Sequence, residues 1–155
     1  MIEDTLESVF AELGQRNTTP RRLMTEELSK LAQTGEGFTA EGLWHRLQRS
    51  NPSIGRATIF RTTKQLVERN VLDCIDFADG TRLYRVCGTR VHDEGDHHHH
   101  LACNSCHRIT DFHFCFPGDQ LEHIGTREHF IVQGHTLTLY GICQDCQYEP
   151  TKYAR

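Results

Sequence analysis

Apolar side chains recur every three or four residues through the N-terminal part of the chain, which is the spacing of a helix with one buried face. The pattern predicts four helices, over residues 2–13, 19–35, 39–51 and 56–69. Thr19 followed by Pro20 fits an N-cap and a proline in the first turn of the second helix, and Thr39 fits the N-cap of the third. We therefore expect a small helical domain here.

The fourth predicted helix has an apolar face and a polar face. The inward stripe is expected to be Ile59, Phe60, Thr63, Leu66 and Val67, and the opposite face Thr58, Arg61, Thr62 and Gln65. Arginine can form two hydrogen bonds to guanine, glutamine can pair with adenine, and threonine can bind phosphate or contact a thymine methyl group. The polar face therefore suits DNA, although a face that is merely solvated has the same composition.

The residues that follow favour the DNA interpretation. Residues 71–77 and 82–86 have the composition of two strands, and Asp79-Gly80 between them is a typical hairpin turn. Three helices, a polar-faced helix and a hairpin make a winged helix. We therefore predict a winged-helix DNA-binding domain over residues 1–86 and, because the next residues are polar and contain glycine, a hinge over residues 87–96.

The rest of the chain predicts a second, smaller domain over residues 97–155. It begins with four consecutive histidines that run as a strand toward Cys103 and Cys106. A strand, a helix and a further strand are expected near residues 109–114, 117–129 and 130–142. The predicted fold class is thus α+β, with the winged helix followed by a small α/β domain.

Charge and metal-binding residue types are divided unevenly between the two parts. Residues 16–69 hold ten Lys and Arg against five Asp and Glu, whereas residues 87–155 hold five against nine. Ten of the eleven His and six of the seven Cys lie at or after Cys87. The basic part therefore suits a polyanion such as double-stranded DNA, and the C-terminal part suits metal.

No apolar run approaches the roughly 18 residues of a membrane-spanning helix, and the acidic start Met1-Ile2-Glu3-Asp4 is unlike a signal peptide. We therefore expect a cytoplasmic protein with no membrane partner. In that reducing compartment, paired Cys-x-x-Cys motifs indicate zinc ligands rather than disulfides.

Two such motifs are present, and together they supply four thiolates for a closed, structural zinc site. The predicted ligands are Cys103, Cys106, Cys143 and Cys146. A thioredoxin-like redox pair is the alternative, but it requires a single Cys-x-x-Cys at the start of a helix that follows a strand. The duplicated motif therefore favours zinc.

Strand alternation divides the histidine run between two faces. His98 and His100 share one face, and the candidate further ligands there are Cys87, Asp73 and Asp111. A thiolate with two imidazoles favours zinc over iron(II) or manganese(II). A buried and inert Cys87 is the alternative.

His97 and His99 lie on the other predicted face. They are expected to meet His135 and a carboxylate from the intervening helix, Asp119 or Glu122. Histidines that bind no metal are the alternative. Of the remaining cysteines, Cys74 is expected to point inward from its strand, and Cys115 has no predicted role.

Three features together resemble the ferric-uptake-regulator family of metal-sensing repressors, from about residue 5 to residue 147: the segment Arg56-Ala57-Thr58-Ile59-Phe60-Arg61, the histidine run and both cysteine pairs. Tyr84-Arg85-Val86-Cys87 followed by the histidines is most similar to the zinc-uptake regulators. The resemblance implies a sensing site of Asp73, Cys87, His98 and His100. It also implies a C-terminal dimerisation domain and a homodimer that binds an operator with inverted-repeat symmetry.

Three positions depart from the family pattern. His99 stands where iron and manganese sensors usually have an aspartate, and Gly37 stands where they often have a hinge histidine. Both departures weaken an iron or peroxide interpretation. Gly118 replaces the glutamate that the second site usually takes, which leaves the fourth ligand of that site open.

The predicted DNA-contacting residues come from two places in the N-terminal domain. They are Arg16, Arg21, Thr58, Phe60, Arg61, Thr62 and Gln65. Arg61 is the residue expected to bind a base through two hydrogen bonds, and Arg16 and Arg21 are expected at phosphate or in the minor groove.

The leading hypothesis is a zinc-responsive transcriptional repressor, not an enzyme, whose zinc-loaded homodimer controls genes of zinc uptake and homeostasis. An iron, manganese, nickel or peroxide sensor of the same family is the first alternative. A zinc hydrolase is less favoured because the chain has no His-Glu-x-x-His motif. A metal buffer would have no use for the polar-faced helix.

Overall fold

The structure is a computed structural model that describes residues 2–12, 18–87, 98–114 and 116–148. The chain forms two compact units, Met1–His92 and Asp93–Arg155. Their boundary falls within the predicted hinge, but residues 88–97 lie outside the described residues, and the domain limits stay a prediction. Among the described residues, no helix is both long and apolar enough to cross a membrane.

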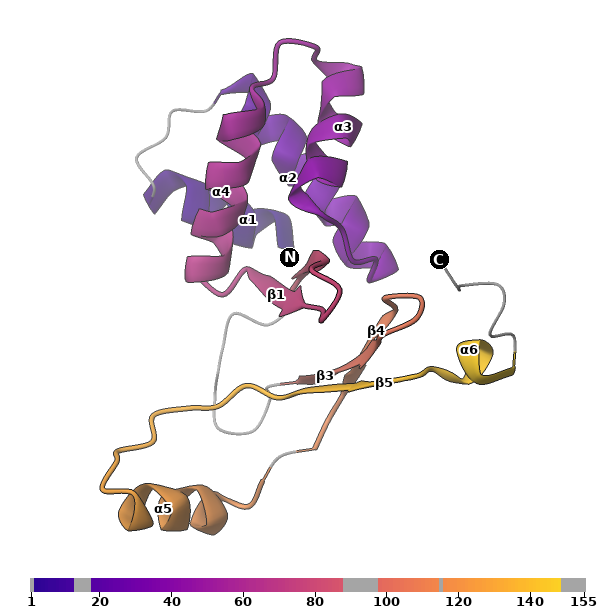
Figure 1. Ribbon diagram of the computed structural model, residues 1–155. Coiled ribbons are helices and arrows are strands. Elements are labelled where there is room, and N and C mark those ends of the chain that lie inside the picture. Colours follow the sequence, from indigo (N-terminus) through magenta and orange to yellow (C-terminus); the bar gives the residue numbers. More distant parts are fainter. Residues whose placement is uncertain (1, 13–17, 88–97, 115, 149–155) are drawn as a thin grey trace. The chain divides into compact units, whose positions relative to one another are not determined.

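Among its described residues, the N-terminal unit contains four helices and one hairpin (Figure 1). The elements are α1 (Ile2–Glu12), α2 (Thr19–Thr34), α3 (Ala40–Ser50), α4 (Arg56–Glu68), β1 (Leu72–Asp76) and β2 (Arg82–Val86). All six were predicted, with ends that agree to within one residue. The N-cap of α2 is Thr18 rather than Thr19, and its side chain makes no capping hydrogen bond. Thr39 caps α3 as predicted, because its hydroxyl accepts the Gly42 N–H at 2.9 Å.

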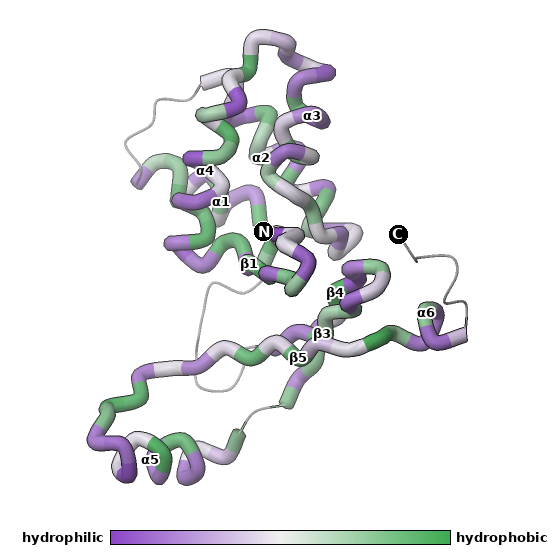
Figure 2. Tube along the Cα trace, in the orientation of Figure 1, coloured by the Kyte–Doolittle hydropathy of each residue, from purple (hydrophilic) through white to green (hydrophobic). Residues whose placement is uncertain are grey.

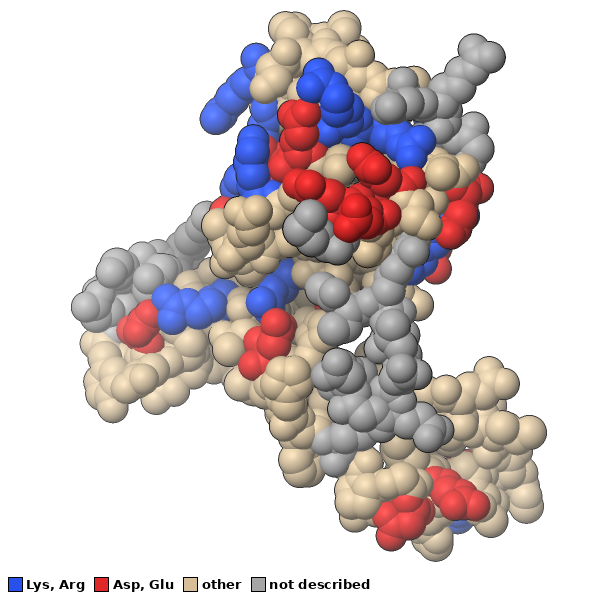
Figure 3. Space-filling model, turned by 180° about the vertical axis from the view of Figure 1, so that it is seen from behind, with Lys and Arg blue, Asp and Glu red and all other residues tan. Residues whose placement is uncertain are grey.

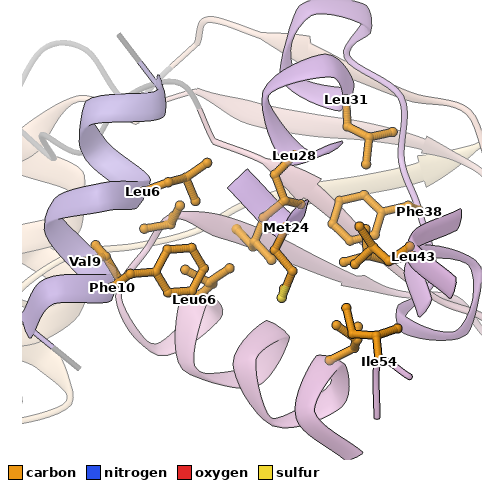
Figure 4. Packing of buried hydrophobic residues seen from close by; sticks show 14 residues of the cluster. Leu6, Val9, Phe10, Met24, Leu28, Leu31, Phe38, Leu43, Ile54 and Leu66 are labelled. Atoms are coloured by element: carbon orange, nitrogen blue, oxygen red, sulfur yellow. The ribbon is translucent and has the colours of Figure 1, made fainter. Parts of the chain in front are cut away.

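One apolar core joins these elements (Figure 4). Its labelled members, each at most 4% exposed, are Leu6, Val9, Phe10, Met24, Leu28, Leu31, Phe38, Leu43, Ile54 and Leu66. Figure 2 shows the matching alternation of apolar and polar residues along the helices. Helix α4 contributes Ile59 and Leu66, both 0% exposed. Because both side chains are locked in the core, the rotation of α4 is set, and with it the residues that face solvent.

The hairpin is an antiparallel pair in which Asp73 lies opposite Arg85. Gly80 turns the chain with φ of 87°, a conformation that glycine adopts without strain. Cys74 is exposed, so the prediction that it points inward is wrong. The buried side chains Ile75 and Phe77 belong to the odd-numbered face, and strand alternation turns Cys74 to the other one.

The described part of the C-terminal unit contains three strands and two helices. These are β3 (His99–Cys103), β4 (Ile109–Phe112), α5 (Gly118–Arg127), β5 (Thr138–Gly141) and α6 (Gln144–Tyr148). The strand order is β4-β3-β5, with β4 antiparallel and β5 parallel to β3. Helix α5 lies away from this sheet (Figure 1).

One prediction for this unit needs correction, and one helix was missed. The last strand covers only Thr138–Gly141, not residues 130–142, because its pairing with β3 begins at Thr138, opposite His100. Apolar composition misled here: Phe130 and Ile131 are 72% and 84% exposed. The short helix α6, which carries Cys146, was not predicted.

Candidate metal centres and DNA-reading helix

Four cysteines converge at one end of the three-stranded sheet. The sulfurs of Cys103, Cys106, Cys143 and Cys146 all lie within 4.8 Å of one another, and those of Cys106 and Cys143 are 3.6 Å apart. The parallel pairing of β3 with β5 places Cys103 beside Gly141, which brings the two Cys-x-x-Cys segments together. Four thiols this close together form a cage that suits a tetrahedral zinc ion.

The thiols of this cage differ in acidity. Desolvation opposes ionisation of Cys103, but backbone N–H groups outweigh it, including that of Cys143 at 3.3 Å, and lower its pKa to about 6. Desolvation raises the pKa of Cys106 to about 12 and also raises the pKa of Cys146. Several thiolates this close repel one another, so a bound dication is what would let all four ionise. The donor set therefore fits zinc.

His98, His100 and Asp111 form a second group, also in the C-terminal unit. Their candidate ligand atoms lie within 4.8 Å of one another. Asp111 is the partner of His100 in the β3–β4 register, and its carboxylate oxygen lies 3.1 Å from Nδ1 of His100. The rings of His98 and His100 are 5.0 Å apart, so both lie on the same side of the strand, as alternation requires.

Asp73 and Cys87 form a pair in the N-terminal unit. Asp73 lies opposite Arg85 on the hairpin, and Cys87 follows two residues later, which makes the two side chains diagonal neighbours on one face. The Cys87 sulfur lies within 4.8 Å of a carboxylate oxygen of Asp73. The Cys87 N–H donates to the Val71 carbonyl at 2.9 Å, and Cys87 is only 8% exposed. The hairpin thus offers one thiol and one carboxylate together.

The other predicted histidine site is different in character. His99 is 1% exposed, and its ring lies 5.5 Å from that of Phe112 and 5.1 Å from that of His135. His97 lies outside the described residues. Asp119 and Glu122 are exposed on α5, and among the described residues neither they nor His99 and His135 belong to a cluster of three or more candidate ligands. The described residues thus bring together two histidines and aromatic rings here.

The outward face of α4 differs from the prediction at two residues. Thr62 is 2% exposed and faces the core, so its assignment to the polar face is wrong; Phe60 is 38% exposed and is not part of the inward stripe. At 100° per residue, Thr62 lies three positions after the buried Ile59 and shares its side, whereas Phe60 is turned away. Arg61 is exposed, and Thr58 and Gln65 are partly exposed.

The structure says less about the two predicted DNA-contacting arginines that precede α4. Arg16 lies outside the described residues. Arg21 donates to the Glu7 carbonyl at 2.7 Å, and its guanidinium lies 5.0 Å from the Phe10 ring centroid. Arg21 therefore ties α2 to α1.

Sequence reasoning did not single out Arg56, which begins α4 and whose guanidinium lies 4.5 Å from the Phe60 ring centroid. Its signal was its position four residues before an aromatic side chain.

Residues 12–140 match the Ferric uptake regulator family. The chain belongs to this family. A "Ferric uptake regulation protein" of Neisseria gonorrhoeae is 31% identical over 134 residues, which cover 86% of this chain and 88% of the relative. As a member of the Ferric uptake regulator family, the chain is a metal-responsive transcriptional regulator.

Solved structures show the same fold. One is reported as "The structure of the Helicobacter pylori ferric uptake regulator Fur reveals three functional metal binding sites" (TM-score 0.68, 18% identity, 94% of this chain and 91% of that one). Another is "Zinc Uptake Regulator Complexed With Zinc AND DNA" (TM-score 0.64, 18% identity, 97% of each chain). The predicted fold class is confirmed: an N-terminal DNA-binding domain followed by a small C-terminal dimerisation domain.

Proposed function

We propose that this member of the Ferric uptake regulator family is a zinc-responsive transcriptional repressor. Its zinc-loaded homodimer binds an operator with inverted-repeat symmetry and controls genes of zinc uptake and homeostasis. It acts in the cytoplasm. The observation that carries the zinc assignment is the Cys87 thiol beside the Asp73 carboxylate, within 4.8 Å.

The proposed sensing site combines this pair with His98 and His100. Thiolate and imidazole are softer ligands than the carboxylates and water that manganese prefers, and a site with one thiolate and two imidazoles favours zinc. Asp111 is a further candidate carboxylate ligand of this site, since it already contacts His100. Because these ligands come from the hairpin and from the start of the C-terminal domain, zinc would favour one arrangement of the two domains.

The four-cysteine cage is proposed to hold a separate, structural zinc. Its two Cys-x-x-Cys segments, the cysteine knuckles, are nearly forty residues apart in the sequence. One ion would therefore join the two ends of the C-terminal domain. A third site would use His99 and His135, with His97 and either Asp119 or Glu122. The contact of 5.1 Å between the His99 and His135 rings supports only the histidine half of it.

Metal controls DNA binding only if it binds the DNA-competent arrangement more tightly than the others. The proposed reading surface is the exposed face of α4, with Arg61 as the base-contacting residue and Thr58, Phe60 and Gln65 around it. Thr62 is not part of this surface, because it is buried.

An iron sensor is the second candidate. The observation that favours it is the similarity to the Neisseria gonorrhoeae relative, a ferric uptake regulation protein 31% identical to this chain. The carboxylate contact of His100 would also suit iron(II).

One experiment separates the two candidates. An operator duplex is first selected from random-sequence DNA by rounds of binding to the purified protein in the presence of zinc, and in parallel in the presence of iron(II). Binding is then titrated against buffered free zinc, iron(II), manganese(II) and nickel(II), with metal content measured beside it. Zinc as the only ion that restores binding at low free concentration supports the proposal, and restoration by iron(II) in its place overturns it.

A further inference from the structure

The guanidinium of Arg56 has two intramolecular partners at the exposed start of α4. Its Nε donates to Oε2 of Glu41 at 2.7 Å, and its Cζ lies 4.5 Å from the centroid of the Phe60 ring. Arg56 and Phe60 are four residues apart and therefore neighbours on the helix surface. The side chains of Arg56 and Glu41 are 60% and 40% exposed, so the group is open to a ligand.

We propose that Arg56 is a DNA-phosphate contact that Phe60 positions and Glu41 restrains. Glu41 thereby weakens the binding of the reading head to any DNA and limits binding away from the operator. The inference rests on the proposed function, because it concerns the same helix.

The geometry gives the two neighbours different effects. An aromatic face orients a guanidinium without neutralising it, since it offers no acceptor with a full negative charge. Glu41 occupies Nε, while arginine has four further N–H donors in a planar fork. Phosphate oxygens compete for that fork, and Glu41 must then give up the arginine or repel the phosphate. Oε1 of Glu41 lies 3.6 Å from Nε2 of His45, which can keep the carboxylate in place after Arg56 leaves it.

Figure 3 shows basic and acidic side chains lying side by side on the N-terminal unit, so local competition of this kind has to be separated from general charge effects. The matched control is Glu68 near the other end of α4. It pairs with Lys64 at 3.9 Å, and its side chain is 55% exposed. Glu68→Gln removes the same charge, from α4 rather than from α3, without releasing Arg56.

The test compares wild type with Glu41→Gln, Arg56→Ala, the double variant and Glu68→Gln, all zinc-loaded. Affinity is measured over a salt series for two probes: the operator duplex selected with wild type, and a random-sequence duplex of the same length. Because an exposed ion pair shifts an equilibrium by roughly two- to fivefold, Glu41→Gln should bind both duplexes tighter by about that factor. Such a gain cannot come from partial unfolding.

Arg56→Ala should weaken binding to both duplexes and reduce the slope of log affinity against log salt by about one. In the double variant the gain from Glu41→Gln should vanish, because no arginine remains to be released. Glu68→Gln should tighten binding less than Glu41→Gln does.

Three outcomes overturn the inference. Glu41→Gln binds no tighter than wild type, or its gain persists without Arg56, or Glu68→Gln gives an equal gain. In each of these cases wild type still binds its operator with zinc, and the proposed function stands. If wild type selects no duplex at any zinc concentration, the proposed function fails and the inference fails with it.

Discussion

Nη2 of Arg108 lies 2.6 Å from Oδ2 of Asp145, an ion pair that ties the two cysteine knuckles together. Arg108 follows Cys106 by two positions, and Asp145 lies between Cys143 and Cys146. The hydrogen bond to Asp145 raises the pKa of Arg108. The pair is about half exposed, so by itself it contributes little to stability. Its position matters more, because it holds the knuckles at the separation that the cage needs.

Asp145→Asn is expected to speed the loss of cage-bound zinc to a chelator by roughly two- to fivefold without changing the fold, because the pair that holds the knuckles is weakened. Zinc release to excess chelator measures it. Glu128→Gln is the control, since it breaks the 2.7 Å pair with Arg127 on α5, outside the cage. Equal release rates for the two variants would show that the Arg108 contact has no effect on the cage.

Cys143→Ser should cost the fold of the C-terminal domain or the dimer rather than only the metal response. Removal of one thiolate forfeits much of the folding free energy that a structural zinc supplies, on the order of 10 kcal/mol. Zinc content, circular dichroism and sedimentation measure the result. Cys74→Ser, an exposed cysteine outside the cage, is the control. A folded, dimeric Cys143→Ser protein would count against a four-thiolate site.

Cys87→Ser should leave the fold and the dimer intact but shift zinc-dependent operator binding to higher free zinc. Serine is a much poorer zinc ligand than a thiolate, whereas its size suits the same buried position. Operator binding at buffered zinc measures the shift, again with Cys74→Ser as the control. Unchanged zinc dependence would leave Asp111 with the two histidines as the site.

Arg61→Ala should weaken binding to the selected operator by about 1–3 kcal/mol per half-site and relax the preference at one base position. Arg61 is exposed on the outward face of α4, and no predicted metal ligand lies beside it in the sequence, so zinc content should not change. Binding to single-base variants of the operator measures the preference. Wild-type affinity at matched salt, with normal zinc content, would exclude α4 as the reading helix.

Thr62→Ala should lower the free energy of unfolding by roughly 0.5–3 kcal/mol and leave operator preference unchanged, because Thr62 packs in the core. Thr58→Ala should leave the free energy of unfolding nearly unchanged and alter operator binding, since Thr58 is partly exposed on the proposed reading surface. Chemical denaturation and operator binding of both variants separate the two roles. A change of base preference in Thr62→Ala would contradict the observed orientation of α4.

The sequence by itself determined the features that depend on neighbouring residues. The three-and-four spacing of apolar side chains located α1 to α4, because a helix repeats every 3.6 residues. Asp79-Gly80 located the hairpin turn, since Gly80 takes the positive φ that the turn requires. Alternation along a strand predicted that His98 and His100 share a side, as their rings do.

Only the tertiary structure decided what depends on distant contacts. The pairing of β3 with β5 brings together cysteines that lie up to 43 positions apart, and no local pattern specifies that register. Residues from 130 onward looked like a strand, but the pairing with β3 begins only at Thr138, so composition alone could not place the strand's start. The rotation of α4 about its axis is set by the burial of Ile59 and Leu66. The spacing of apolar residues in the sequence did not determine that rotation. That rotation turned Thr62 inward, left Phe60 exposed, and placed Arg56 between Phe60 and Glu41.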